Sequence, residues 1–272
     1  MNRRALYLAI AIIGAAVSIR PQLAADAGPL IHAHAHNDYG HARPLLDALA
    51  HGFCSVEADV FLVNGELLVA HDADRVQPGR TLEALYLDPL RERARAQHGH
   101  LYADATECTL LIDVKSEAAS TYAILREVLA RYADILTVFR GDSVEHRAVM
   151  AIVSGNRAVA LIALDPVRYA AVDGNLADLD STASADLVPW ISLDWRSLFT
   201  WNGSGPMAPG EQRMLRVLVT RAHGQGRKVR FWDAPDVPAG WELLWDAGAD
   251  LISTDDLAGL EAFLRKSHGG RE

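Results

Sequence analysis

The sequence predicts an α/β fold, a single-domain (β/α)8 TIM barrel, and three observations favour it. Short apolar runs rich in β-branched residues alternate with helical segments over nearly the whole chain. Several runs are apolar throughout, such as residues 110–112 and 251–252. This composition is typical of strands in a parallel sheet that helices cover on both faces. No glycine-rich dinucleotide fingerprint follows the first predicted strand, which favours the barrel over a doubly wound open sheet.

The predicted strands and helices follow one another along the chain. Strands are expected at residues 30–36, 53–60, 109–114, 148–153, 158–164, 188–194, 228–233 and 250–254. Helices are expected between them, at residues 42–51, 81–97, 118–132, 209–224, 241–247 and 257–266. About 245 residues is a usual length for a one-domain barrel, so residues 28–272 are assigned to it.

The amino-terminal segment has the pattern of an export signal. Arg3 and Arg4 precede an apolar run over residues 5–17, which is too short to cross a bilayer comfortably, and small residues follow at 24–27. We therefore expect residues 1–27 to be a cleaved signal peptide, with an uncleaved anchor as the alternative. The protein would then be exported, either periplasmic or secreted, with no stable membrane span after cleavage.

The composition is that of a globular protein with a sizeable core. Hydrophobic residues make up 50% of the chain and charged residues 22%, and the formal net charge is -9. That charge disfavours a nucleic-acid partner, because phosphate backbones are bound by clustered lysine and arginine. Two cysteines, Cys54 and Cys108, are too few for a disulfide scaffold, and they are expected on the helix-facing side of neighbouring strands. Whether they form a disulfide or stay as buried thiols is left open.

Carboxylates stand at the ends of two predicted strands. Glu57 and Asp59 are two residues apart in an apolar run, so their side chains project to the same side of the strand. Asp113 and Lys115 repeat this spacing at the end of the next strand, and the carboxyl ends of barrel strands meet at one face. Three carboxylates suit Mg²⁺ or Ca²⁺ and leave positions open for substrate. The sequence therefore predicts a divalent-cation site at Glu57, Asp59 and Asp113.

Two histidines accompany these carboxylates. His36 ends the first predicted strand, and His71 lies in the excursion after the second. Cleavage of a phosphodiester requires one proton to leave the nucleophile and another to reach the leaving oxygen, while charge on the phosphoryl group is neutralised. Histidine titrates near neutral pH, so His36 and His71 are predicted to be the catalytic acid and base.

Further residues near the strand ends are candidates for contact with substrate. They are Lys115, His34, Asn37, Asn156 and Trp232. His34 shares a face with His36 and is either catalytic, a phosphate contact or a packed residue behind it; packing is favoured because His36 is nearer the strand end. Trp232 is expected either to line a lipid or sugar pocket or to belong to the core. Asp255 is expected to cap the last helix rather than bind metal.

These motifs resemble those of a known superfamily. Residues 34–39, 55–60, 154–157 and 253–257 are similar to segments of the phosphodiesterases that share the barrel of phosphatidylinositol-specific phospholipase C and glycerophosphodiester phosphodiesterase. Within that superfamily the chain looks most like the branch called altered inheritance of mitochondria, over nearly all of the mature sequence. The resemblance implies a TIM barrel, a divalent cation at Glu57, Asp59 and Asp113, and acid/base roles for His36 and His71.

The chain departs from the glycerophosphodiester phosphodiesterase pattern at two positions. Asn37 follows His36 where those enzymes have an arginine that touches phosphate, so Lys115 is expected to supply that charge. Asp113 stands where they carry glutamate, and with Lys115 it resembles the sphingomyelinase D type of site, which forms a cyclic phosphate. The product is therefore left open between a monoester and a cyclic phosphate.

The expected function is that of a divalent-metal-dependent phosphoric diester hydrolase acting on a small-molecule or lipid phosphodiester. Three alternatives are kept. The first is a metal-free lyase of the phospholipase C type, and the second is a protein that binds phosphorylated ligands without turnover. The third is a zinc amidohydrolase, which would need further histidines at the later strand ends.

Overall fold

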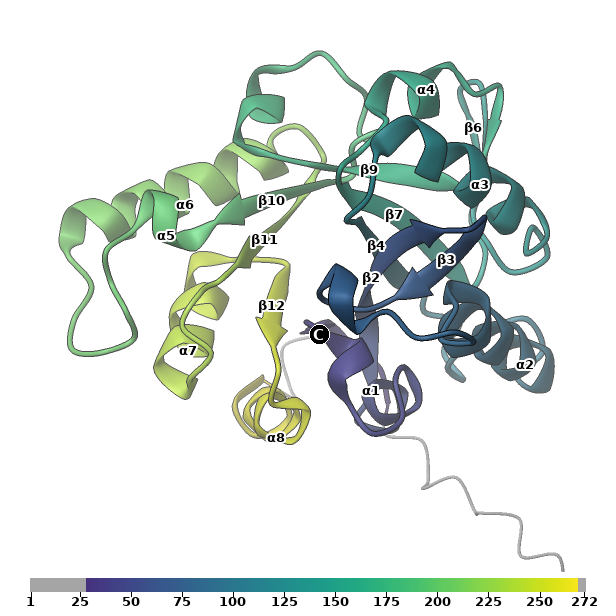
Figure 1. Cartoon of the computed structure of the whole chain (residues 1–272). Helices are drawn as coiled ribbons and strands as arrows, with labels where there is room; N and C mark the ends of the chain where they lie inside the picture. Colours follow the sequence, from purple (N-terminus) through teal and green to yellow (C-terminus); the bar gives the residue numbers. More distant parts are fainter. Residues whose placement is uncertain (1–27, 269–272) are drawn as a thin grey trace, which may run out of the picture.

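Eight parallel strands form a closed barrel in residues 28–268, the part of the chain that the computed structural model describes (Figure 1). The barrel closes because β1 pairs with both β2 and β12. In chain order its strands are β1 (Leu30–Ala35), β2 (Phe53–Val63), β4 (Cys108–Val114), β7 (Val149–Gly155), β9 (Ala170–Gly174), β10 (Trp190–Asp194), β11 (Lys228–Trp232) and β12 (Leu251–Thr254). The expected (β/α)8 TIM barrel is confirmed.

Helices surround the strands on the outside of the barrel (Figure 1). They are α1 (Leu46–Ala50), α2 (Asp88–Ala96), α3 (Ala118–Ala130), α4 (Val159–Leu164), α5 (Trp195–Leu198), α6 (Pro209–His223), α7 (Pro238–Ala247) and α8 (Leu257–His268). Short turns of 3-10 helix are η1 (Asp38–Gly40), η2 (Ala73–Arg75) and η4 (Leu176–Asp180), and a π-helical turn, η3 (Glu83–Leu87), leads into α2. A small antiparallel sheet of β5 (Val138–Arg140), β6 (Ser143–Glu145) and β8 (Val167–Arg168) is separate from the barrel sheet in its hydrogen bonding.

One predicted strand is wrong. Of the strand expected at residues 158–164, Val159–Leu164 form helix α4, and the fifth barrel strand is β9, which was not among the predicted strands. An apolar run of six residues fits a buried strand and a short helix equally well, so periodicity could not separate them. The real strand, Ala-Ala-Val-Asp-Gly, is short and contains a single β-branched residue, so its local signal is weak.

A hairpin extends β2 beyond the barrel and returns the chain toward the carboxyl ends of the barrel strands. β2 runs for 11 residues and pairs antiparallel with β3 (Glu66–Val69). The turn consists of Asn64 and Gly65, which both have positive φ, at 52° and 85°. Two left-handed residues are what a two-residue hairpin turn requires, and Asn-Gly is the sequence that tolerates it best. The hairpin thus determines where the segment after β3 lies.

The barrel interior changes from apolar to polar along the strands. The layer nearer the amino ends of the strands is apolar and contains Leu111, Ile152, Ala171, Trp190 and Leu251, together with Phe139 from β5. Two residues further along β4 and β9, the inward positions are Asp113 and Asp173. The alternate residues, such as Val56 and Ala58 of β2, are buried against the helices. Polar side chains therefore gather at the carboxyl ends of the strands.

Both cysteines are buried free thiols on neighbouring strands, on the helix-facing side as expected. Cys54 and Cys108 occupy adjacent register positions, one step before the Ser55–Thr109 pair. A hydrogen bond with Cys54, together with burial, raises the pKa of the Cys108 thiol well above its usual value. The predicted leader, residues 1–27, lies outside the described residues. Within residues 28–268, no helix has the length and apolar character needed to span a bilayer.

Candidate active site

A cavity of about 390 Å³ opens at the carboxyl ends of the barrel strands. Eight of the ten residues predicted for the site line it: His36, Asn37, Glu57, Asp59, His71, Asp113, Lys115 and Trp232. His34 and Asn156 do not line it. His34 is fully buried below the cavity, and the Asn156 amide donates to the backbone carbonyls of Lys115 and Ser116.

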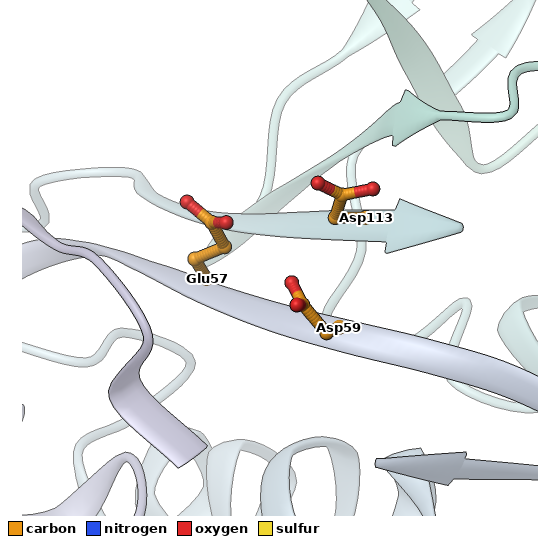
Figure 2. Close-up of side chains that lie close together, drawn as sticks. All are labelled: Glu57, Asp59 and Asp113. Carbon is orange, nitrogen blue, oxygen red and sulfur yellow. The ribbon is translucent and has the colours of Figure 1, made fainter. Parts of the chain in front are cut away.

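Three carboxylates rise from two neighbouring strands into the same space (Figure 2). Glu57 and Asp59 alternate along β2, and Asp113 of β4 lies in register with Asp59. One oxygen from each can be chosen so that all lie within 4.8 Å of one another. Burial, and then the charge of Glu57, raise the pKa of Asp59 to about 6. The cluster therefore holds negative charge that its own surroundings do not fully compensate.

The donor atoms of this cluster fit a hard divalent cation. Asp59 Oδ1 and Asp113 Oδ1 are both buried and have no hydrogen-bond partner in the described structure. Buried oxygens without partners are costly, and oxygens of this type are the ligands that Mg²⁺ and Ca²⁺ prefer. Lys115 occupies the other side, with Nζ 2.9 Å from Asp113 Oδ2 and 3.2 Å from Asp59 Oδ2. Each aspartate thus offers one oxygen that the protein leaves free.

Glycine at position 155 makes room for Asp113. Gly155 ends β7 with φ of +67°, a conformation that other residues rarely adopt. A Cβ at this position would collide with Asp113 Oδ1 and with the backbone carbonyl of Val114. The backbone of β7 therefore approaches the carboxylate more closely than any side chain would allow.

A buried ionic network lies beneath the carboxylates. Arg230 of β11 donates from Nη1 to Glu57 Oε2 at 2.9 Å and from Nε to Ser192 Oγ at 3.1 Å. Burial opposes the charge on Glu57, but Arg230 and the hydrogen bond from His34 outweigh it and hold the pKa of Glu57 well below its usual range. Burial and Arg230 lower the pKa of His34 to about 4, so this imidazole is neutral at pH 7. His34 Nδ1 lies 2.6 Å from Ser55 Oγ.

The loop that follows the last barrel strand, β12, supplies an acidic hydrogen-bond partner for His36. Its Nδ1 lies 2.9 Å from Asp255 Oδ1, and the Asn37 amide lies 3.3 Å from the same oxygen. Burial lowers the pKa of His36, but the hydrogen bond to Asp255 and the charges of Glu57 and Asp255 outweigh it, so the net pKa is raised. Asp255 therefore does more than close the turn before α8: it orients the imidazole and favours its protonated form.

His71 reaches the cavity from the segment that follows the hairpin. Its Nδ1 lies 2.9 Å from Tyr39 Oη and 3.3 Å from Asp59 Oδ2. Tyr39 in turn donates to Asp59 Oδ2 at 2.8 Å, and burial together with Asp59 raises the pKa of the phenol, which keeps it protonated. With Nδ1 engaged in this way, Nε2 is the nitrogen of His71 that is available for proton transfer.

Several residues that line the cavity were not among the predicted site residues. They include Ser154, Arg157, Asp173, Ser192 and Arg230. Arg157 follows Asn156 and lines the cavity, while its Nη1 donates to the Asp173 carbonyl. Arg230 could have been found from sequence, because it lies two residues before Trp232 and so shares its face of the strand. Asp173 could not, because its strand was missed.

Comparison with known proteins identifies the family. A profile described as an AIM6-like phosphodiesterase domain matches residues 22–170, more than half of the chain. The chain belongs to the AIM6-like phosphodiesterase family. The resemblance drawn from the motifs is thereby confirmed, and the matched range contains His36, Glu57, Asp59, His71 and Asp113.

Named relatives of this AIM6-like chain come from fungi. "Altered inheritance of mitochondria protein 6" of Eremothecium gossypii is 30% identical over 89% of the chain and 72% of the relative. The Arthroderma benhamiae homologue is 27% identical over 84% and 82%, and the Saccharomyces cerevisiae protein is 28% identical over 82% and 68%. A crystal structure of glycerophosphodiester phosphodiesterase from Agrobacterium tumefaciens shares the fold, with a TM-score of 0.51 and 15% identity over 86% of this chain and 99% of that one.

These relatives correct one expectation. Their names refer to mitochondria, a cellular organelle, and not to the periplasm or to secretion. The expected export of this AIM6-like protein to the periplasm or the medium is therefore set aside.

Proposed function

We propose that the protein is a divalent-metal-dependent phosphoric diester hydrolase, with His71 as general base and His36 as general acid. One observation carries the proposal. Two imidazoles border a cluster of three carboxylates, and each has its Nδ1 anchored, by Asp255 in one case and by Tyr39 and Asp59 in the other. A site that only binds phosphate has no need for a second oriented imidazole.

The roles follow from the partners of each ring. His36 has a raised pKa because of Asp255, so it carries the proton that the leaving oxygen needs. Because the Tyr39 hydroxyl donates to Asp59, its oxygen can accept from His71 Nδ1, and in that tautomer His71 Nε2 can take a proton from water. The water oxygen forms a bond to phosphorus, the ester P–O bond breaks, and the leaving alcohol departs with the proton from His36. Each proton transfer is worth roughly a hundred- to ten-thousandfold in rate.

The remaining groups hold the phosphoryl charge. Glu57, Asp59 and Asp113 would bind the cation, which when present supplies positive charge to the phosphoryl oxygens. Arg157 and Lys115 line the same cavity and offer cationic groups to a diester anion. The all-carboxylate character of the cluster supports Mg²⁺ or Ca²⁺ over the zinc site of an amidohydrolase. The partner we propose is therefore a phosphodiester, either a small molecule or a lipid.

The experiment is hydrolysis of a panel of phosphodiesters by the purified protein with Mg²⁺, Ca²⁺ or chelator, followed by phosphorus NMR. We expect cation-dependent turnover, and the spectrum separates an open monoester from a cyclic phosphate. His36→Ala and His71→Ala should each lower kcat by at least about a hundredfold. His146→Ala, at an exposed histidine outside the cavity, is the matched control and should leave kcat unchanged. Full activity in excess chelator would favour the metal-free lyase instead.

A further inference from the structure

A second cavity, of about 520 Å³, adjoins the catalytic one. It lies between η4, which follows β9, the end of β10 with α5, and the end of β11. Asn175, Ser192 and Trp232 line both cavities, so the two form one continuous depression. A group attached to a phosphate in the first cavity can therefore extend into the second without leaving the protein surface.

Apolar side chains form the exposed part of this second cavity. Leu176 of η4 is 45% exposed and Trp232 is 41% exposed, and both contribute to the lining. Leu198 of α5 completes the wall and is itself partly buried against the core. Large apolar side chains that are exposed together in a concave site next to a catalytic pocket are typical of a ligand subsite.

Several polar atoms of the second cavity already have partners within the protein. Asn175 Oδ1 accepts from the Ala177 backbone at 2.9 Å, and Asp194 Oδ1 accepts from the Arg196 backbone at 3.0 Å. Ser197 Oγ donates to the Asp194 carbonyl at 2.9 Å. The carboxylate of Asp180 pairs with Arg221, which does not line the cavity. The large exposed apolar side chains that a ligand would meet in this cavity are Leu176 and Trp232.

Charge narrows the choice of ligand further. Asp180 and Asp194 line the cavity, and no lysine or arginine does so among the residues that the structure describes. An anionic substituent would be repelled there by these two carboxylates. An uncharged hydrocarbon group meets no such repulsion and matches the exposed apolar surface of Leu176 and Trp232.

We propose that the second cavity binds a hydrocarbon group esterified to the scissile phosphate. This rests on the proposed phosphodiesterase function and defines its substrate class: diesters in which one alcohol is apolar. Trp232 lies between the two regions. The phosphate would bind on one side, near His36 and the carboxylates, and the hydrocarbon on the other side, near Leu176.

The test uses glycerol phosphodiesters whose second alcohol is methanol, butanol or octanol, below the micellar concentration of the longest. Each methylene that the cavity buries should raise kcat/KM by up to about fourfold. We expect the butyl ester to exceed the methyl ester by at least about tenfold, mainly through KM. Leu176→Ser should reduce this chain-length dependence, measured as the ratio of kcat/KM for the butyl ester to kcat/KM for the methyl ester. Leu161→Ser is the matched control, because Leu161 is 47% exposed on α4 and lines neither cavity.

A binding measurement separates failure of the subsite from failure of the enzyme assignment. Calorimetry with octyl phosphate and methyl phosphate needs no turnover, and we expect octyl phosphate to bind at least about tenfold more tightly in a Leu176-dependent manner. Equal affinity for both, or equal kcat/KM for all three diesters, would overturn the subsite and leave the hydrolase intact. Tighter binding of octyl phosphate without hydrolysis of any diester would retain the subsite and reject the hydrolase.

Discussion

Replacing Arg230 with methionine should destabilise the protein strongly, because this arginine neutralises a buried carboxylate. The side chains of Arg230 and Glu57 are 5% and 6% exposed, and their charged atoms lie 2.9 Å apart. A second carboxylate, Asp173, lies 3.8 Å from the guanidinium. Removing one member of a buried pair leaves an uncompensated charge and costs about 3–5 kcal/mol. In a chain of this size each kcal/mol lowers Tm by about 2–4 °C, so we expect a decrease between about 6 and 20 °C.

Urea unfolding of three variants at pH 7 measures this effect. Arg230→Met should lose about 3–5 kcal/mol, and adding Glu57→Gln should restore at least about 1 kcal/mol, since the amide carries no charge to bury. Arg140→Met is the matched control, because Arg140 pairs with Glu145 at 3.0 Å where both side chains are about half exposed. That variant should change by less than about 1 kcal/mol. The reasoning fails if Arg230→Met is as stable as wild type, or if the double variant is no more stable than Arg230→Met alone.

Three further changes probe the site itself. Asp255→Asn should lower the pKa of His36, because the aspartate raises it. If protonated His36 is the acid, the alkaline limb of the pH profile of kcat should move to lower pH. A limb that does not move would contradict that role. Gly155→Ala should lower the free energy of unfolding by more than about 1 kcal/mol and weaken Mg²⁺ binding, because the new Cβ would displace the Asp113 carboxylate. The control is Gly79→Ala, also at positive φ but in open space. It should lower the free energy of unfolding by less and leave Mg²⁺ binding unchanged. Asp113→Asn should weaken divalent-cation binding by at least about tenfold in calorimetry, and unchanged affinity would exclude it as a ligand.

Much of the barrel could be predicted from sequence because most of its strands carry a local signal. β2 combines an apolar run with two carboxylates at a spacing of two, and β4 combines one with Asp113, which Lys115 follows two residues later. The sequence therefore predicted both strands and their inward faces. β9 carries no such signal, and its small residues are buried only because neighbouring strands surround them. Helix α4 has the opposite property: its apolar composition predicts burial, yet most of its residues are exposed.

The site was predictable where it is local in sequence and not where it depends on closure of the barrel. Glu57 and Asp59 lie on the first strand of one hairpin and His71 follows its second strand, so their proximity follows from short-range geometry. The pairing of His36 with Asp255 joins residues 219 positions apart, and the pairing of Glu57 with Arg230 joins residues 173 apart. Such contacts follow only from the order in which the strands close, which no local pattern records.

Along the chain, the residues proposed for catalysis and metal binding come before the residues that line the second cavity. The proposed acid, the proposed base and the three carboxylates all fall between His36 and Asp113, on the first three barrel strands or in the segments that directly follow β1 and β3. The residues that line the second cavity come from Asn175 onward. Transplanting η4 and α5 from a relative should therefore change the alcohol that is accepted, while His36, its partner Asp255 and the three carboxylates stay in place. Relatives that share the first half need not act on the same lipid or metabolite.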